Sequence, residues 1–331
     1  MMGEMIGMKT KWLTILALIV LTVVGFRLGS ASAADYPRRP IIMVCPWGAG
    51  GGTDACSRII ATLLKNELGV PVNVVNRTGG GGAVGHTAMA TAKPDGYTIG
   101  MPTVEITMMH WMGLTKVTYK DMTPIALVNA DPSAINVRTD SPWKTYEDLV
   151  DYVKKHPGEL KDSGTGQGGI WHLGMAGWLK AIGLAPDAIK WIPSRGAAPA
   201  LQDLMAGGIH MSTCSLPEAA TLIEAGKVRP LAIMADKRDP KFPDVPTLKE
   251  KGADWTCAAW RGIAAPKGTP PEIVTILEKA VAKVHKSPEF LKFMKNRGYG
   301  VTWMDAANFS TFLAKADKDN GEVMKAAGII K

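Results

Sequence analysis

The segment Cys45–Asp54, which reads CPWGAGGGTD, decides the fold because it joins a buried strand to an amphipathic helix. The apolar run Ile41–Val44 before it has the composition of a buried parallel strand. After it, apolar residues recur at i, i+3, i+4, i+7 and i+8 from Cys56 to Leu64, which is the helical pattern. A glycine-rich turn in this position gathers backbone N–H groups at the positive end of a helix dipole. The sequence therefore predicts an anion-binding turn.

The ends of this helix are also marked in the sequence. Thr53 or Asp54 is a suitable N-cap, and Gly69 a suitable end. Asp54 has a second interpretation, as a ligand contact.

A secretory signal peptide is predicted over residues 1–33. Lys9 and Lys11 precede the apolar run Leu13–Phe26, and Ala31–Ala33 supplies a small-x-small cleavage site. The run is shorter than the roughly 20 residues of a membrane-spanning helix. We therefore expect an exported protein, with an uncleaved anchor as the alternative.

The charges of the chain do not indicate a nucleic-acid-binding protein. The 38 basic and 30 acidic residues are spread without a basic block, and a mildly positive balance is consistent with an anionic ligand. Cys45, Cys56, Cys214 and Cys257 are expected to be buried free thiols, because a chain of this length builds a core without disulfides.

A second strand, glycine turn and helix follow the first. The strand is predicted at Val72–Val75, the turn at Asn76–Gly85, the helix to about Ala92, and a third strand at Tyr97–Met101. Successive βαβ units place both turns at the carboxyl ends of neighbouring strands. The two glycine turns should therefore converge on one edge of a sheet.

A second α/β unit is predicted further along the chain. The helix over 145–156 has a capping box from Thr145 and Asp148 and ends at Pro157-Gly158. Small-residue turns at 164–169 and 194–197 then alternate with helices and strands. In the C-terminal part of the chain, an apolar stripe predicts a helix that is capped by Thr269 or begins at Pro271. The predicted strands are Ile189–Ile192, Ile209–Thr213 and Leu231–Ala235.

The order of these short motifs resembles the extracytoplasmic solute receptors of tripartite tricarboxylate transporters, the Bug family. The resemblance covers essentially the whole mature chain. It rests on eight short motifs in the same order as in that family: Gly50–Asp54, Asn76-Arg77 before Gly80-Gly81, Lys93–Tyr97, Pro142–Thr145, Gly164–Gly169 with His172-Leu173, Gly196–Ala200, Pro243–Thr247 and Ala265–Pro270. It implies a type II periplasmic binding protein: an α/β fold of two domains that close over a small carboxylate in the cleft between them. We expect domain 1 at 34–128 plus 259–331 and domain 2 at 129–258.

No motif for catalysis or for a metal or cofactor is apparent. Gly52 is followed by Thr53-Asp54 rather than the Lys-Ser/Thr of a P-loop, there is no Gly-x-Ser-x-Gly elbow, and the six histidines lack metal-ligand spacing. We therefore expect binding without catalysis, with no catalytic residue, metal or cofactor.

The turns and the resemblance together give the candidate ligand contacts. Trp47 is either a core residue or part of the pocket wall, and His172 is favoured as a packing residue. Arg195 stands where the family has Lys. We expect Arg195 either to pair with a ligand carboxylate or to be exposed to solvent. The candidates are Trp47, Gly50, Gly51, Thr53, Asp54, Asn76, Gly80, Gly81, Thr103, Thr165, Gly166, Gln167, Gly169, Arg195, Gly196, Ala197 and Ser215.

The predicted function is a monomeric periplasmic receptor that delivers a small carboxylate to membrane transporter subunits. A ligand-sensing partner of a membrane histidine kinase is the alternative, and an exported hydrolase or transferase a third. Dicarboxylates, tricarboxylates, acidic amino acids and aromatic acids all remain open, and Trp47, Trp111 and Trp171 near the turns favour an aromatic acid. Gly80→Val is expected to weaken binding at least tenfold by blocking the anion.

Overall fold

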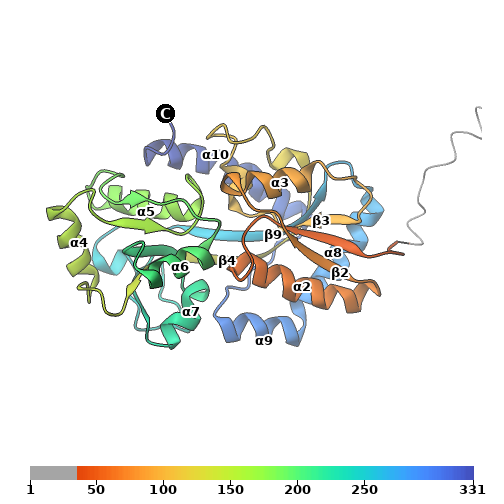
Figure 1. Ribbon diagram of the computed structural model, residues 1–331. Helices are drawn as coiled ribbons and strands as arrows, with labels where there is room; N and C mark the ends of the chain where they lie inside the picture. The colour runs from red at the N-terminus through yellow and green to blue at the C-terminus, as the bar shows by residue number, and fades with distance from the viewer. Residues whose placement is uncertain (1–35) are drawn as a thin grey trace, which may run out of the picture. The chain divides into compact units, whose positions relative to one another are not determined.

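Two sheets that share one long strand form the framework of the protein (Figure 1). The computed structural model describes residues 36–331, so the predicted signal peptide lies outside the described residues. Residues 39–331 form one compact unit. None of the helices in residues 36–331 combines the length and the apolar character that a membrane span requires.

The first sheet is built on three parallel strands in the order β2-β1-β3. They are β1 (Ile41–Cys45), β2 (Val72–Asn76) and β3 (Thr98–Gly100), and β9 (Ala258–Pro266) pairs antiparallel with β3. All but one residue of β1 are buried, as expected for a central parallel strand. Both glycine turns follow the carboxyl ends of adjacent parallel strands, which confirms that prediction.

Five helices belong to the first sheet. Helix α2 (Gly52–Leu68) packs against β2 and against α8 (Pro271–Lys286), while α3 (Ala83–Ala90) contacts β1 and β3. Helices α9 (Pro288–Arg297) and α10 (Ala306–Ala326) complete the set, and α10 contacts β4. The C-terminal helices thus support the first sheet, as predicted. Short 3-10 segments lie at Gly80–Gly82 (η2), Val104–Thr107 (η3), Tyr119–Asp121 (η4) and Lys249–Lys251 (η5).

The shared strand is β4 (Met122–Arg138), which the sequence did not predict. It pairs with β9 as far as Pro132 and with β7 from Ser133 onward. Proline is normally confined to edges and bulges of sheets; Pro124 lies at a register shift and Pro132 at the change of partner. The predicted domain boundaries fall inside β4 and at the start of β9, and the division into two domains stays a prediction.

The second sheet extends from the distal end of β4. Strands β7 (Met211–Ser215) and β8 (Val228–Ile233) pair with β4 antiparallel, and β5 (Lys161–Ser163) lies parallel between β7 and β6 (Lys190–Trp191). The predicted strands are present, with bounds shifted by one to three residues. The helices of this half are α4 (Tyr146–Lys155), α5 (Ile170–Ala181), α6 (Ala197–Ala206) and α7 (Leu216–Glu224).

The predicted helix ends are confirmed in part. The Thr145 hydroxyl accepts from the Asp148 amide and the Asp148 carboxylate accepts from the Thr145 amide, so the capping box is present. Pro271 opens α8 at its first position, whereas the Thr269 hydroxyl donates to the Pro266 carbonyl and does not cap. Gly69 ends α2 in the left-handed conformation, with φ 72°.

The four cysteines are buried free thiols, as predicted. Burial raises the pKa of Cys45 to about 11 and the pKa of Cys56 and Cys257 to about 12, because a thiolate loses its hydration there. These thiols therefore act as apolar core side chains at neutral pH.

Candidate functional site

The first glycine turn is filled by the protein's own groups. The Gly50 amide donates to Asp54 Oδ2 at 2.9 Å, and the Gly52 amide donates to Glu218 Oε1 at 3.2 Å. The Gly51 amide reaches the Gly48 carbonyl at 3.4 Å. The prediction that this turn presents unpaired amides to an anion is therefore wrong for Gly50, Gly51 and Gly52 in this structure.

Asp54 has a structural role in this turn. Its carboxylate accepts from the Gly50 amide, from Arg58 Nε and from Asn76 Nδ2, each at 2.9 Å. Burial opposes its ionisation, but the hydrogen bonds from Arg58, Gly50 and Asn76 outweigh burial and lower its pKa. The N-cap of α2 is Gly51, without a side-chain cap, so the predicted capping by Thr53 or Asp54 is wrong.

The second glycine turn keeps two free amides. Gly79, Gly80, Gly81 and Gly82 all have positive φ, and this left-handed backbone requires glycine. The Gly82 amide donates to the Gly79 carbonyl, whereas the amides of Gly80 and Gly81 have no hydrogen-bond partner among residues 36–331. This turn is available to a ligand acceptor.

The second glycine turn meets a turn from the other half of the protein. A Cβ on Gly166 would lie only 2.6 Å from Gly81 Cα, so these two backbones are in direct contact. In the part of the chain that is described, the Gly166 and Gln167 amides also have no hydrogen-bond partner. Two pairs of unsatisfied amides, one from each half, thus come together.

These two turns line an outer chamber of about 530 Å³. Trp47, Leu114, Pro193, Ser194 and Pro199 complete its wall. Five predicted residues line it beside Trp47: Gly80, Gly81, Gly166, Gln167 and Arg195.

A much smaller inner cavity adjoins the outer chamber, and Trp47 borders both. Its volume is about 20 Å³, which is room for one water-sized group. The predicted residues on its wall are Trp47, Gly51, Thr53, Thr103, Thr165, Gly196 and Ala197.

The remaining predicted residues line neither chamber. Asp54 and Asn76 bond to each other behind the first turn, and Ser215 caps α7 with Glu218. Those outside both walls are Gly50, Asp54, Asn76, Gly169 and Ser215. His172 accepts from the Gly168 amide and stacks on Trp191, and Trp111 is exposed and donates to the Asp317 carbonyl, so neither lines these chambers.

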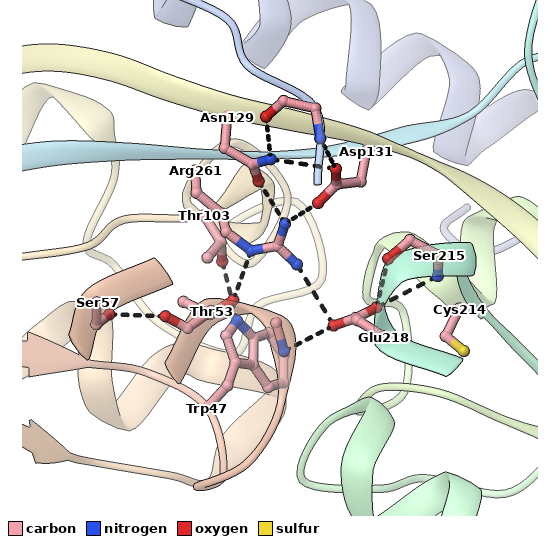
Figure 2. A network of polar contacts seen from close by, with 12 residues as sticks. Trp47, Thr53, Ser57, Thr103, Asn129, Asp131, Cys214, Ser215, Glu218 and Arg261 are labelled. Atoms are coloured by element: carbon pink, nitrogen blue, oxygen red, sulfur yellow. Dashed lines mark hydrogen bonds and ion pairs between the residues drawn. The ribbon is translucent and has the colours of Figure 1, made fainter. Parts of the chain in front are cut away.

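A buried arginine organises the floor of the inner cavity (Figure 2). Arg261, on β9, is 2% exposed. Its Nη1 donates to Asn129 and Asp131, its Nε donates to the Thr53 hydroxyl at 3.1 Å, and its Nη2 reaches Glu218 Oε1 at 3.4 Å. Burial raises the pKa of Asp131 and Glu218, while the Arg261 guanidinium favours their ionised forms. The network joins β4, β9, α2 and α7 at one point.

A second buried carboxylate, Glu105, lies on the same wall. Its Oε1 accepts from the Ile170 amide at 3.1 Å and its Oε2 from the Thr103 hydroxyl, which in turn accepts from Trp47 Nε1 at 3.1 Å. Among the described residues, no cation lies within ion-pair distance of Glu105. Burial therefore raises the pKa of Glu105.

His86 fixes the second glycine turn to this wall. Its Nε2 accepts from the Thr103 amide at 3.1 Å, so Nδ1 carries the proton and donates to the Gly82 carbonyl at 2.8 Å. Burial lowers the pKa of His86 to about 4, so the ring is neutral at neutral pH.

Sequence reasoning missed the three charged residues of the inner cavity. Glu218 had a local signal, because Ser215-x-x-Glu218 is a capping box before an apolar segment. Arg261 interrupts the apolar run of β9, and a charge inside a buried strand requires a partner. Glu105 had no such signal. Trp260 and Ile170 also line the cavity and were not predicted.

The architecture is that of a periplasmic binding protein: two α/β halves that share a strand, with chambers lined by turns from both. The chain belongs to the tripartite tricarboxylate transporter receptor family, whose model matches residues 56–329.

Solved structures agree with this family. The periplasmic binding protein BugD is 32% identical, with a TM-score of 0.83 over 89% of this chain and 100% of that chain. A protein from Rhodopseudomonas palustris solved with adipate is 30% identical, with a TM-score of 0.83 over 89% and 99%. MatC from the same organism, solved with malate, is 28% identical, with a TM-score of 0.80 over 87% and 99%.

Proposed function

We propose that the protein is a periplasmic receptor that captures a small carboxylate between its two halves and delivers it to a tripartite tricarboxylate-type membrane transporter. The observation that carries this proposal is the meeting of four unsatisfied amides, those of Gly80, Gly81, Gly166 and Gln167, on one chamber wall. Relatives of the same family hold malate and adipate.

The chemistry of the outer chamber suits a carboxylate. A hydrogen bond to a charged acceptor contributes roughly 1.5–3 kcal/mol, so four such bonds supply on the order of 8 kcal/mol before the costs of association. Arg195 borders the same chamber and adds a positive charge. Because the amides come from both halves, a bound carboxylate stabilises the arrangement in which the halves are together.

The proposal is tested by comparing acids with neutral analogues of the same shape. We expect carboxylates such as malate or adipate to raise the melting temperature of the purified protein in proportion to their affinity. The matched amides, such as adipamide, should give no shift, because they lack the anionic acceptor. Equal shifts for acids and amides, or no shift with any carboxylate in a broad panel, would contradict the proposal.

A further inference from the structure

The inner cavity and the outer chamber have opposite electrostatic character. The outer chamber offers N–H donors and Arg195, whereas the inner cavity has the carboxylates of Glu105 and Glu218 on its wall. Arg261, the cation on the inner wall, already pairs with Asp131 and Glu218. A second carboxylate of a ligand would therefore meet like charge in the inner cavity.

Glu105 is the residue that indicates what the inner cavity accepts. It is 1% exposed and has no ion-pair partner in the described chain, although a buried carboxylate is normally paired with a cation. Each of its oxygens accepts one hydrogen bond, from Ile170 and Thr103, and a carboxylate has room for more. Arg261 favours the ionised form of Glu105 from beyond ion-pair distance, and a ligand cation would be its first direct ion-pair partner.

The walls and the size of the cavity restrict that cation. Trp47, Trp171 and Trp260 line the cavity, and apolar walls strengthen the attraction between a cation and a carboxylate. The volume of about 20 Å³ admits one water-sized group. A primary ammonium has that size, whereas a trimethylammonium does not fit.

The two chambers are close together. Thr165 lines the inner cavity and its neighbour Gly166 lines the outer chamber. In the same way, Gly196 lines the inner cavity and its neighbour Arg195 lines the outer chamber. Consecutive Cα atoms are about 3.8 Å apart. A ligand that spans both chambers therefore has its two charged ends separated by only a few bonds.

We infer that the ligand is a short amino carboxylate, whose primary ammonium enters the inner cavity beside Glu105 and whose carboxylate is held by the amides of the outer chamber. This inference rests on the proposed function, because it assigns one end of the ligand to the carboxylate chamber. It adds the requirement for a primary amine.

Calorimetry with matched ligands tests the inference. The probes are the amino carboxylates β-alanine and 4-aminobutanoate, their des-amino analogues propanoate and butanoate, the N-trimethyl derivative of 4-aminobutanoate, and malate and adipate. We expect at least one amino carboxylate to bind at least tenfold more tightly than its des-amino and N-trimethyl analogues.

The alternative outcomes separate the inference from the proposed function. Binding of malate or adipate without any preference for the amines overturns the inference and leaves the proposed function standing. Binding of none of these probes overturns the inference, whereas only the failure of every carboxylate in the broad panel overturns the proposed function.

A variant pair locates the amine. Glu105→Gln keeps the shape of the side chain and removes its charge, so the preference for the amine over its des-amino analogue should fall at least tenfold. Glu289→Gln, an exposed glutamate on α9, should leave this preference unchanged. An unchanged preference in Glu105→Gln would overturn the inference even if its melting temperature falls.

Discussion

At the scale of single residues, Arg261 is the most constrained side chain of the site. It is buried on a central strand and bonds to Asn129, Asp131, Thr53 and Glu218. A buried guanidinium is stable only when its N–H groups and its charge are satisfied. The same residue therefore positions Glu218, which fills the first glycine turn.

Removing the guanidinium leaves the carboxylates of Asp131 and Glu218 buried without their cation. We expect Arg261→Met to lower the free energy of unfolding by about 3–5 kcal/mol, the usual cost of breaking a buried ion pair on one side. Urea denaturation measures this loss. In the control Arg238→Met, which breaks a surface pair with Glu250, the loss should stay below about 1 kcal/mol. A loss of that small size in Arg261→Met would show that the network does not stabilise the fold.

The sequence predicted which backbone segments form the site better than which charges complete it. Trp47, Gly166 and Gln167 follow from their positions in turns, and all line a chamber. Arg261 reaches the cavity from β9, which is remote in sequence from those turns, and a single sequence contains no record of that proximity. Glu105 lies two residues after the predicted contact Thr103, but the sequence does not show which way its side chain points.

At the scale of elements, the strands with a regular apolar pattern were the predictable ones. β1 is an uninterrupted apolar run, and its helix has an apolar stripe of helical period. β4 contains two prolines and four buried polar residues, which are Asn129, Asp131, Ser133 and Asn136, so no periodicity identifies it. Its length and its change of partner at Pro132 depend on β7 and β9, which are distant in sequence.

The capping box of α4 gives a prediction at this scale. Thr145→Ala removes the hydroxyl that accepts from the Asp148 amide, so the unfolding free energy should fall by about 1 kcal/mol. Chemical denaturation measures the change. Thr311→Ala on α10 is the control, because that hydroxyl donates to a carbonyl within an intact helix and should cost less than about 0.5 kcal/mol. Equal losses in the two variants would show that the box does not determine where α4 begins.

At the scale of the whole folded unit, the two halves are joined at the site by a small set of contacts. The Gly48 amide donates to the Arg195 carbonyl at 3.1 Å, the Gly52 amide donates to Glu218, and the Ile170 amide donates to Glu105. The structure therefore shows the two halves in contact. Glu218 accepts a hydrogen bond from an amide at the start of α2, and Glu105 accepts one from an amide at the start of α5. A ligand adds to this arrangement at the amides that remain free.

The contact between Gly81 and Gly166 offers a direct test of whether binding requires the halves to meet. Gly80→Val is a poorer test than the sequence suggested, because Gly80 has φ 56° and valine is strained there whatever it blocks. Gly166 has no positive φ, yet its Cβ would lie 2.6 Å from Gly81 Cα, a backbone atom that cannot move aside alone. Alanine at this position acts as a wedge between the two turns.

We expect Gly166→Ala to weaken binding of the best carboxylate at least tenfold in calorimetry, because the wedge separates the amides that share the ligand. Gly226→Ala is the control: its left-handed φ of 67° costs about 1 kcal/mol of stability, but its Cβ meets open space and Gly226 lines neither chamber, so affinity should be unchanged. The pair distinguishes loss of closure from loss of stability. If Gly166→Ala binds within twofold of the parent protein, the ligand is held by one half alone, and capture between the two halves is not the mechanism.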